Sequence, residues 1–166
     1  MEAWNERVVE EANLFNPAFC AMLIAKACKD YSKKGQDTLS FPLAFLILPL
    51  IVHPGTRAAL PYSTATSLIS WTQERRGDLV EFGAHTRRLL PYTREAIMFG
   101  LAHTMLTLDE SGGINTGKSY VAPTEKKTEL FTSEVRDCLD RAGFVGRWFA
   151  AAGTASTIYS VLGVTP

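Results

Sequence analysis

The sequence predicts a mainly α-helical fold: one compact helical domain spanning residues 1–166, with a small β-hairpin, in the order of a winged-helix module. Three observations predict it. Capping residues and glycine or proline stops divide most of the chain into amphipathic segments of helical spacing. One run, residues 40–53, is almost continuously apolar and must lie in the core. Only residues 104–114 alternate, around a Gly-containing turn, as strands of a hairpin do.

The composition is that of an ordinary globular protein. Hydrophobic residues make up 46% and charged residues 20% of the chain, and 17 Lys and Arg balance 17 Asp and Glu. No bulk positive field therefore draws the protein to nucleic acid or to anionic lipid. The acidic, amphipathic N-terminus is unlike a secretory signal, which predicts a cytoplasmic protein. A membrane span is not expected, because it needs about 20 apolar residues without interruption.

The apolar run 40–53 favours a buried helix that organises the rest of the core. Ser40 is suited to cap it, Pro42 suits its first turn, and Pro49 is expected to kink it. A buried strand is the alternative, because periodicity cannot separate the two over a short run. Before it, residues 4–15 and 17–32 predict an amphipathic helix and a helix that is apolar nearly all round, the second capped by Asn16.

Further cap-and-stop signals predict the remaining helices. The expected ranges are 56–60, 64–75, 78–90, 93–105, 133–152 and 156–163. The expected caps are Ser63 or Thr64, Asp78, Thr93 and Ser133. Residues 115–132 are polar and predict a loop or arm within the single domain. Gly143 and Gly146 lie near the inner face of their helix, where missing side chains would allow another backbone to approach closely.

Residues 112–119 match the phosphate-binding pattern G-x-x-x-x-G-K-[ST]. A true phosphate-binding loop follows a buried strand and opens a helix, whereas Asp109 and Glu110 precede this match and Pro123 follows it. No later apolar strand ends in the Asp that would hold magnesium. A Gly-rich hairpin turn is therefore the favoured interpretation, and a P-loop nucleotide-binding protein is the less favoured one.

No other pattern predicts catalysis, a metal site or a cofactor. His53, His85 and His103 are scattered and lack a second ligand at metal spacing. The three cysteines lack CxxC spacing and are interpreted as reduced core residues: Cys20, Cys28 and Cys138. The sequence therefore predicts a protein that is not an enzyme and has no cofactor.

Two groups of residues are candidates for binding. A basic face for nucleic acid is a weak hypothesis, with helix-terminating surface charges as the simpler interpretation; its members are Arg57, Arg75, Arg76, Arg87, Arg88 and Lys118.

Arg147 and Trp148 are the second group. Phe149 continues an apolar stripe, so Trp148, about 100° away, is expected near its edge. Trp and Arg often anchor interfaces, which predicts partner docking; a core Trp148 is the alternative.

Several motifs, in the same order along the chain, resemble the middle component of bacterial ABC three-component systems. They lie at residues 15–20, 48–53, 56–61, 93–96, 141–150, 157–159 and 162–166. Phe15-Asn16-Pro17 and Gly143-Phe144-Val145-Gly146-Arg147-Trp148-Phe149 are examples. The resemblance therefore spans essentially the whole chain.

This resemblance implies a small accessory subunit that works with an SMC- or Rad50-like ABC ATPase and an effector such as a nuclease. Lamassu-type defence against phage or plasmids is the implied setting, with DNA contact inside the complex and no membrane. The family has no established catalytic residues to carry over. A winged-helix DNA-binding regulator is the alternative function.

Overall fold

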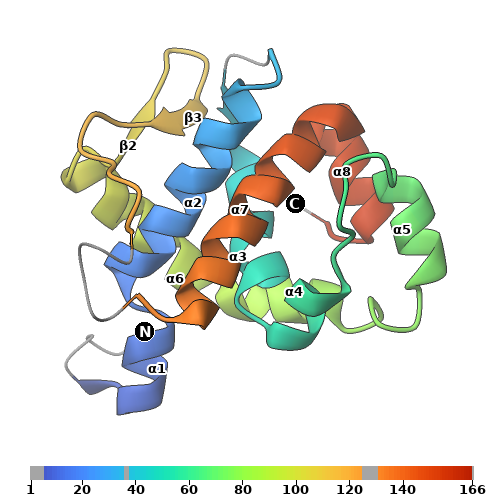
Figure 1. Ribbon diagram of the computed structural model, residues 1–166, viewed down its shortest axis with the longest axis horizontal. Helices are drawn as coiled ribbons and strands as arrows, with labels where there is room; N and C mark the ends of the chain where they lie inside the picture. Colours follow the sequence, from blue (N-terminus) through green and yellow to red (C-terminus); the bar gives the residue numbers. More distant parts are fainter. Residues whose placement is uncertain (1–5, 36–37, 125–130, 166) are drawn as a thin grey trace.

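Helices dominate the computed structural model, which describes residues 6–35, 38–124 and 131–165 (Figure 1). The α-helices are α1 (Val9–Leu14), α2 (Pro17–Ser32), α3 (Ala44–Ile51), α4 (Pro54–Ala59), α5 (Leu68–Glu74), α6 (Phe82–Ala102), α7 (Ser133–Ala152) and α8 (Ala155–Leu162). Three short strands, β1 (Leu39–Ser40), β2 (Leu106–Leu108) and β3 (Gly113–Thr116), complete the fold. The predicted mainly α class with a small hairpin is confirmed. None of the described helices is both long and apolar enough to cross a membrane.

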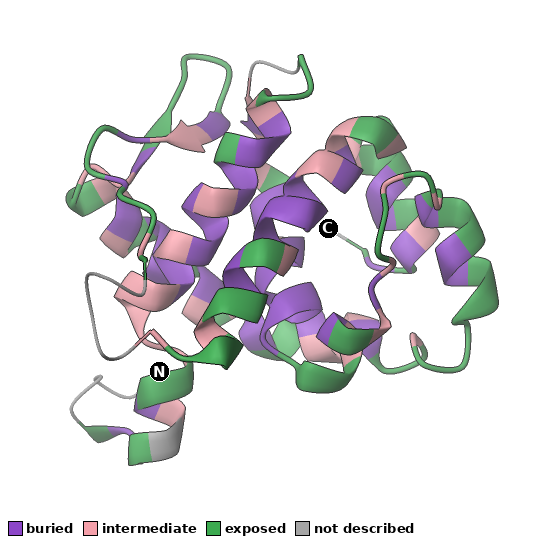
Figure 2. Ribbon diagram, in the orientation of Figure 1, coloured by how far each residue is buried: buried purple, intermediate pink, exposed green. Residues whose placement is uncertain are grey.

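α2 and α3 form the centre of the core, where many side chains are fully buried; purple marks the buried residues of both helices in Figure 2. α2 begins as predicted, because the side chain of Asn16 accepts hydrogen bonds from the amides of Ala18 and Phe19. α3 confirms the helix rather than the strand for the apolar run. Its start differs from the prediction, since Ser40 belongs to β1 and a 3-10 helix, Phe41–Leu43, leads into α3.

α7 and α6 pack on different sides of this centre. Both lie along α2 and both contact α3, yet they make little direct contact with each other. In Figure 1, α7 lies beside α2 and in front of α3, while α6 runs behind them. The central pair is therefore enclosed between two long helices.

The approach of α7 to α2 depends on a glycine. A Cβ atom added to Gly146 would overlap the carbonyl oxygen of Ala27 and would lie 2.9 Å from its carbonyl carbon. One turn earlier, a Cβ on Gly143 would lie 2.5 Å from the carboxylate of Asp30. The predicted backbone approach is confirmed for Gly146, and at Gly143 the close neighbour is a side chain.

The hairpin is confirmed and gains a third strand. β2 and β3 pair antiparallel, and β1 joins the other edge of β3, so the order is β1-β3-β2. Leu39 is opposite Ile114 in this register, and both side chains are fully buried. A two-residue strand is too short to show alternation in the sequence, which is why β1 was not predicted.

α6 replaces two predicted helices. The prediction that one helix stops before Pro91 and another begins at Thr93 is wrong, because α6 runs through Pro91 without a break. Pro91 removes one backbone hydrogen bond, but packing along α2 and α3 holds the helix together. Thr93 is buried and donates its hydroxyl hydrogen to the carbonyl of Leu89 instead of capping.

Other predicted boundaries shift by a few residues. Ser67, rather than Ser63 or Thr64, caps α5, and Thr132, rather than Ser133, caps α7. Asp78 caps no helix, since α6 begins only at Phe82. Neighbouring Ser and Thr residues are equally suited by residue type to cap a helix, so the backbone conformation decides which of them becomes the N-cap.

The predicted loop at residues 115–132 is shorter in the structure. Asn115 and Thr116 belong to β3, and residues 117–124 follow without a helix or strand. Residues 125–130 lie outside the described part, as does Trp4 of the first predicted helix.

Gly146→Ala should destabilise the protein, although alanine favours helix. The added methyl overlaps a backbone carbonyl that cannot move alone, and overpacking of this kind costs about 1–3 kcal/mol. The measurement is the free energy of unfolding by chemical denaturation. Gly83→Ala is the control, because its Cβ would meet nothing closer than a carbonyl oxygen at 3.6 Å, an ordinary contact. Equal stability of the two variants would show that α7 does not depend on this contact.

Candidate interaction site

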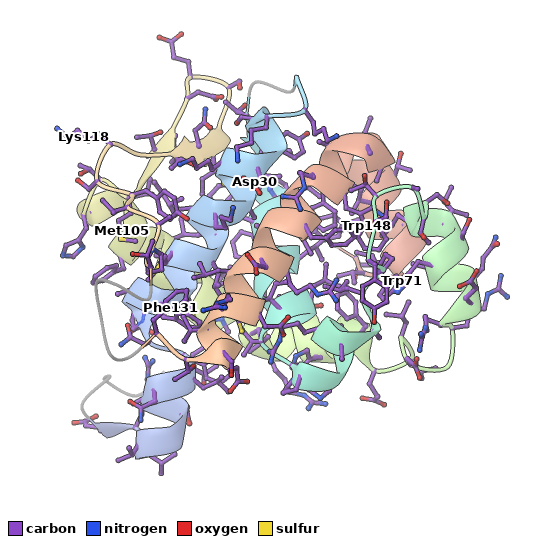
Figure 3. The ribbon with its side chains drawn as sticks, in the orientation of Figure 1. Asp30, Trp71, Met105, Lys118, Phe131 and Trp148 are labelled. Carbon is purple, nitrogen blue, oxygen red and sulfur yellow. The ribbon has the colours of Figure 1, made fainter. Side chains whose placement is uncertain are left out.

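The phosphate-binding pattern lies in the hairpin and has the geometry of a strand. Ile114 is fully buried in β3, and no helix follows Ser119 among residues 120–124. The amides that would cradle a phosphate already donate to protein oxygens: Gly113 to the Asp109 carboxylate and Gly117 to the Met105 carbonyl. Lys118 is exposed at the edge of the molecule (Figure 3). The match is therefore a hairpin sequence with its own hydrogen bonds.

Arg57, the first member of the predicted basic face, is a buried structural residue. Its guanidinium donates to Asp137 at 2.6 Å, to Glu134 at 3.0 Å and to the carbonyl of Ile51 at 2.8 Å. These bonds tie α4 to the first turns of α7 and to the end of α3. Its charge is satisfied within the fold.

The other members of that predicted face are exposed but do not gather in one place. Arg75 and Arg76 follow α5, whereas Arg87 and Arg88 lie on α6. Lys118 lies on the opposite side of the view from α5 (Figures 1 and 3). The structure therefore divides the predicted basic face into separate small groups.

Trp148 lies in the core and not at the edge of the α7 stripe, where the sequence placed it. Its side chain is 1% exposed, its indole N–H donates to the carbonyl of Thr66 at 2.8 Å, and its ring meets Trp71 edge to face at 5.3 Å. α7 packs against α2 and α3 and against α8, and Trp71 of α5 contacts Trp148, so a wide arc of the helix is buried. The indole offers no exposed surface for a partner in this conformation.

Arg147, the other predicted docking residue, is about one-third exposed and belongs to a charged cluster that the sequence analysis missed. The cluster centres on Asp30, which lies at the α2–α7 contact and is labelled in Figure 3. Arg147 donates to one carboxylate oxygen of Asp30, Lys26 donates to the same oxygen at 3.1 Å, and Lys33 donates to the other at 2.8 Å. One carboxylate thus holds three cations.

Burial and hydrogen bonding act on Asp30 in opposite directions. The carboxylate is 2% exposed, and this burial alone would raise its pKa. Hydrogen bonds and charge from Lys33 and Lys26 outweigh it, so the pKa lies below its ordinary value of 3.8. Asp30 therefore stays ionised at neutral pH, and the cluster keeps two surplus positive charges near the surface.

The remaining titratable groups form no metal-binding set in the part of the chain that the structure describes. All three cysteines are buried free thiols, and desolvation raises the pKa of Cys20 and Cys28 to about 12. His53 accepts a hydrogen bond from the amide of Thr56 at the start of α4, and its ring meets that of His85 at 5.6 Å.

Asp30→Asn should destabilise the protein at neutral pH by roughly 1–3 kcal/mol, because the buried cluster loses its single negative charge. The folded pKa of Asp30 is depressed, so its contribution is present above about pH 4 and is lost as the pH falls through the folded value. The difference in melting temperature from wild type should therefore shrink in acid. Asp140→Asn, an exposed change on α7, is the control. A difference that is independent of pH would contradict this account of the charge.

Comparison with known proteins reveals one match. A family model described as "ABC-three component (ABC-3C) system Middle Component 3" matches residues 4–166. Searches of the curated proteins and of the solved structures found no significant match. The match covers nearly the entire chain, including every described helix and strand. The chain therefore belongs to the middle component 3 family of ABC three-component systems.

Proposed function

We propose that this protein is a non-catalytic accessory subunit that joins an SMC- or Rad50-like ABC ATPase to an effector, such as a nuclease, in anti-phage or anti-plasmid defence of the Lamassu type. Membership of the middle-component family supports an accessory role in a three-component system. Such a role requires binding surfaces rather than a reaction centre.

The observation that carries the proposal is the Asp30 cluster, defined by Lys26, Asp30, Lys33 and Arg147. Three cations share one carboxylate, and two of them remain accessible: the side chains of Lys33 and Arg147 are 60% and 36% exposed. Asp30 orients the Arg147 guanidinium, which reduces the entropy lost when it binds a second carboxylate. The cluster therefore fits a partner surface that carries acidic side chains.

A second candidate function is DNA contact, alone or within the complex. The exposed Arg87 and Arg88 on α6, the long helix that precedes the hairpin, favour it, because this is the helix order of the predicted winged-helix module. Binding to short duplexes by the isolated chain, weakening steeply with salt, would support this function.

Arg147→Ala should abolish co-purification with the ATPase or effector while changing the melting temperature little. Asp30 keeps two lysine partners in this variant, and a partly exposed ion pair contributes about 1 kcal/mol or less. The measurement is co-purification of the components expressed together, with melting recorded for each variant. Arg76→Ala removes an exposed cation far from the cluster and is the control. An intact complex with the Arg147 variant would remove the cluster from the interface.

Lys118→Ala should leave ATP hydrolysis by the assembled complex and its defence activity within about twofold of wild type. The amides around it are committed to the hairpin, so the lysine has no phosphate cradle beside it. The measurements are ATP turnover of the complex and nucleotide binding by the isolated subunit. Nucleotide binding that disappears in the variant would show that the hairpin is a nucleotide site.

A further inference from the structure

An apolar cavity lies between α6, α8, α3 and the 3-10 helix Phe41–Leu43 that leads into α3. Its volume is about 460 Å³, within the range of cavities that hold ligands. Bulky side chains make its floor: Phe41, Phe45, Leu90 and Tyr159. The rings of Phe41 and Phe45 meet edge to face with their centroids 5.5 Å apart, so these two aromatic side chains pack against each other in the floor.

Two arginines flank this floor. Arg87 and Arg94 line the cavity, are both exposed, and are two helical turns apart on one face of α6, roughly 10 Å along its axis. Leu90 lies between them. Neither arginine takes part in an ion pair with any described residue.

Two of the three side-chain hydroxyls that line this cavity are already used within the fold. The Tyr159 hydroxyl donates to the carbonyl of Pro42 at 2.7 Å, and the Thr86 hydroxyl donates to the carbonyl of Phe82 at 2.8 Å. None of the described residues that line the cavity is acidic. The guanidiniums are therefore the main groups left to select a ligand by charge.

We propose that this cavity, which we call the α6 groove, binds a short segment of a partner protein that places one bulky apolar side chain on the aromatic floor between two carboxylates. The apolar side chain would lie over Leu90, and each carboxylate would accept a bidentate pair of hydrogen bonds from Arg87 or Arg94. The two arginines define the spacing, and the floor defines the kind of side chain between them.

The shape and chemistry favour a protein segment over DNA. A phosphate backbone would use the arginines but would leave the aromatic floor uncovered, whereas an acidic and apolar segment uses both. Phe41, Phe45 and Leu90 are only half-buried, and clustered apolar side chains that remain partly open to solvent are found at protein interaction sites. Arg94, which completes the pair, was absent from the basic face predicted from the sequence.

This inference rests on the proposed function and gives the accessory subunit a second docking surface. The Asp30 cluster lies at the α2–α7 contact, and the α6 groove lies on the side of α6. Since α6 and α7 pack on different sides of α2 and α3, two partners can bind without competing for the same surface.

The test uses the full chain expressed together with the other components of its own system. Arg87→Glu with Arg94→Glu should lower recovery of one partner at least tenfold, and the Lys pair at the same positions should restore part of it. Arg75→Glu with Arg76→Glu is the control, matched in charge and exposure, and melting temperatures confirm that each variant folds. A photo-crosslinking phenylalanine derivative in place of Leu90 then identifies what occupies the groove by mass spectrometry.

Crosslinking to a partner segment with an apolar residue flanked by Asp or Glu supports the inference. Crosslinking to DNA, to a second copy of this chain, or to a segment without carboxylates overturns it. If the wild-type complex forms and the variant with the Glu pair forms it equally well, the inference is overturned and the proposed function stands. Failure of the wild-type components to associate would overturn both.

Discussion

The contact between Gly146 and the backbone of Ala27 is the constraint on which the rest of the structure depends. It allows α7 to lie directly on α2, so that the residues on either side of it meet the neighbouring elements. One turn away, the missing side chain of Gly143 leaves space for the Asp30 carboxylate. Arg147, the residue after Gly146, then donates a hydrogen bond to that carboxylate from α7. A helix packed even slightly farther away would separate the arginine from Asp30 and expose the buried faces of both helices.

The same arrangement explains why this small chain can offer two surfaces. α2 and α3 are buried nearly all round, so α6 and α7 cover them from different sides and turn their polar faces outward. The charged surface on α7 depends on a satisfied ionic cluster, whereas the groove on α6 has an apolar floor flanked by two arginines that form no ion pair with any described residue. These two chemistries fit different partners, as the proposed role of a subunit that joins two other proteins requires.

Local signals in the sequence were sufficient for part of this architecture. The Asn16 cap, the apolar core helix, the hairpin and the close approach at Gly146 could all be predicted, because each is encoded within a few residues. The continuity of α6 could not. Its packing along two other helices outweighs the helix-breaking tendency of Pro91, and the residues next to Pro91 in the sequence do not reveal such tertiary contacts.

The candidate sites were harder to predict for the same reason. Arg147 was identified by residue type, but its partner Asp30 lies more than a hundred positions away in the chain. Trp148 was placed at an edge because the sequence shows one apolar stripe, whereas α5 and α8 cover a second face of α7. The spacing of Lys26 and Lys33 around Asp30 was the available signal, since residues three and four apart share a helix face.

The structure of the assembled three-component complex, determined by electron cryomicroscopy, would show directly which surfaces of this subunit bind its partners. The ATPase and the effector should contact this subunit on different sides, one at the Asp30 cluster beside α7 and the other at the α6 groove. A complex in which both partners bind one side, or in which this subunit contacts only DNA, would contradict this expectation.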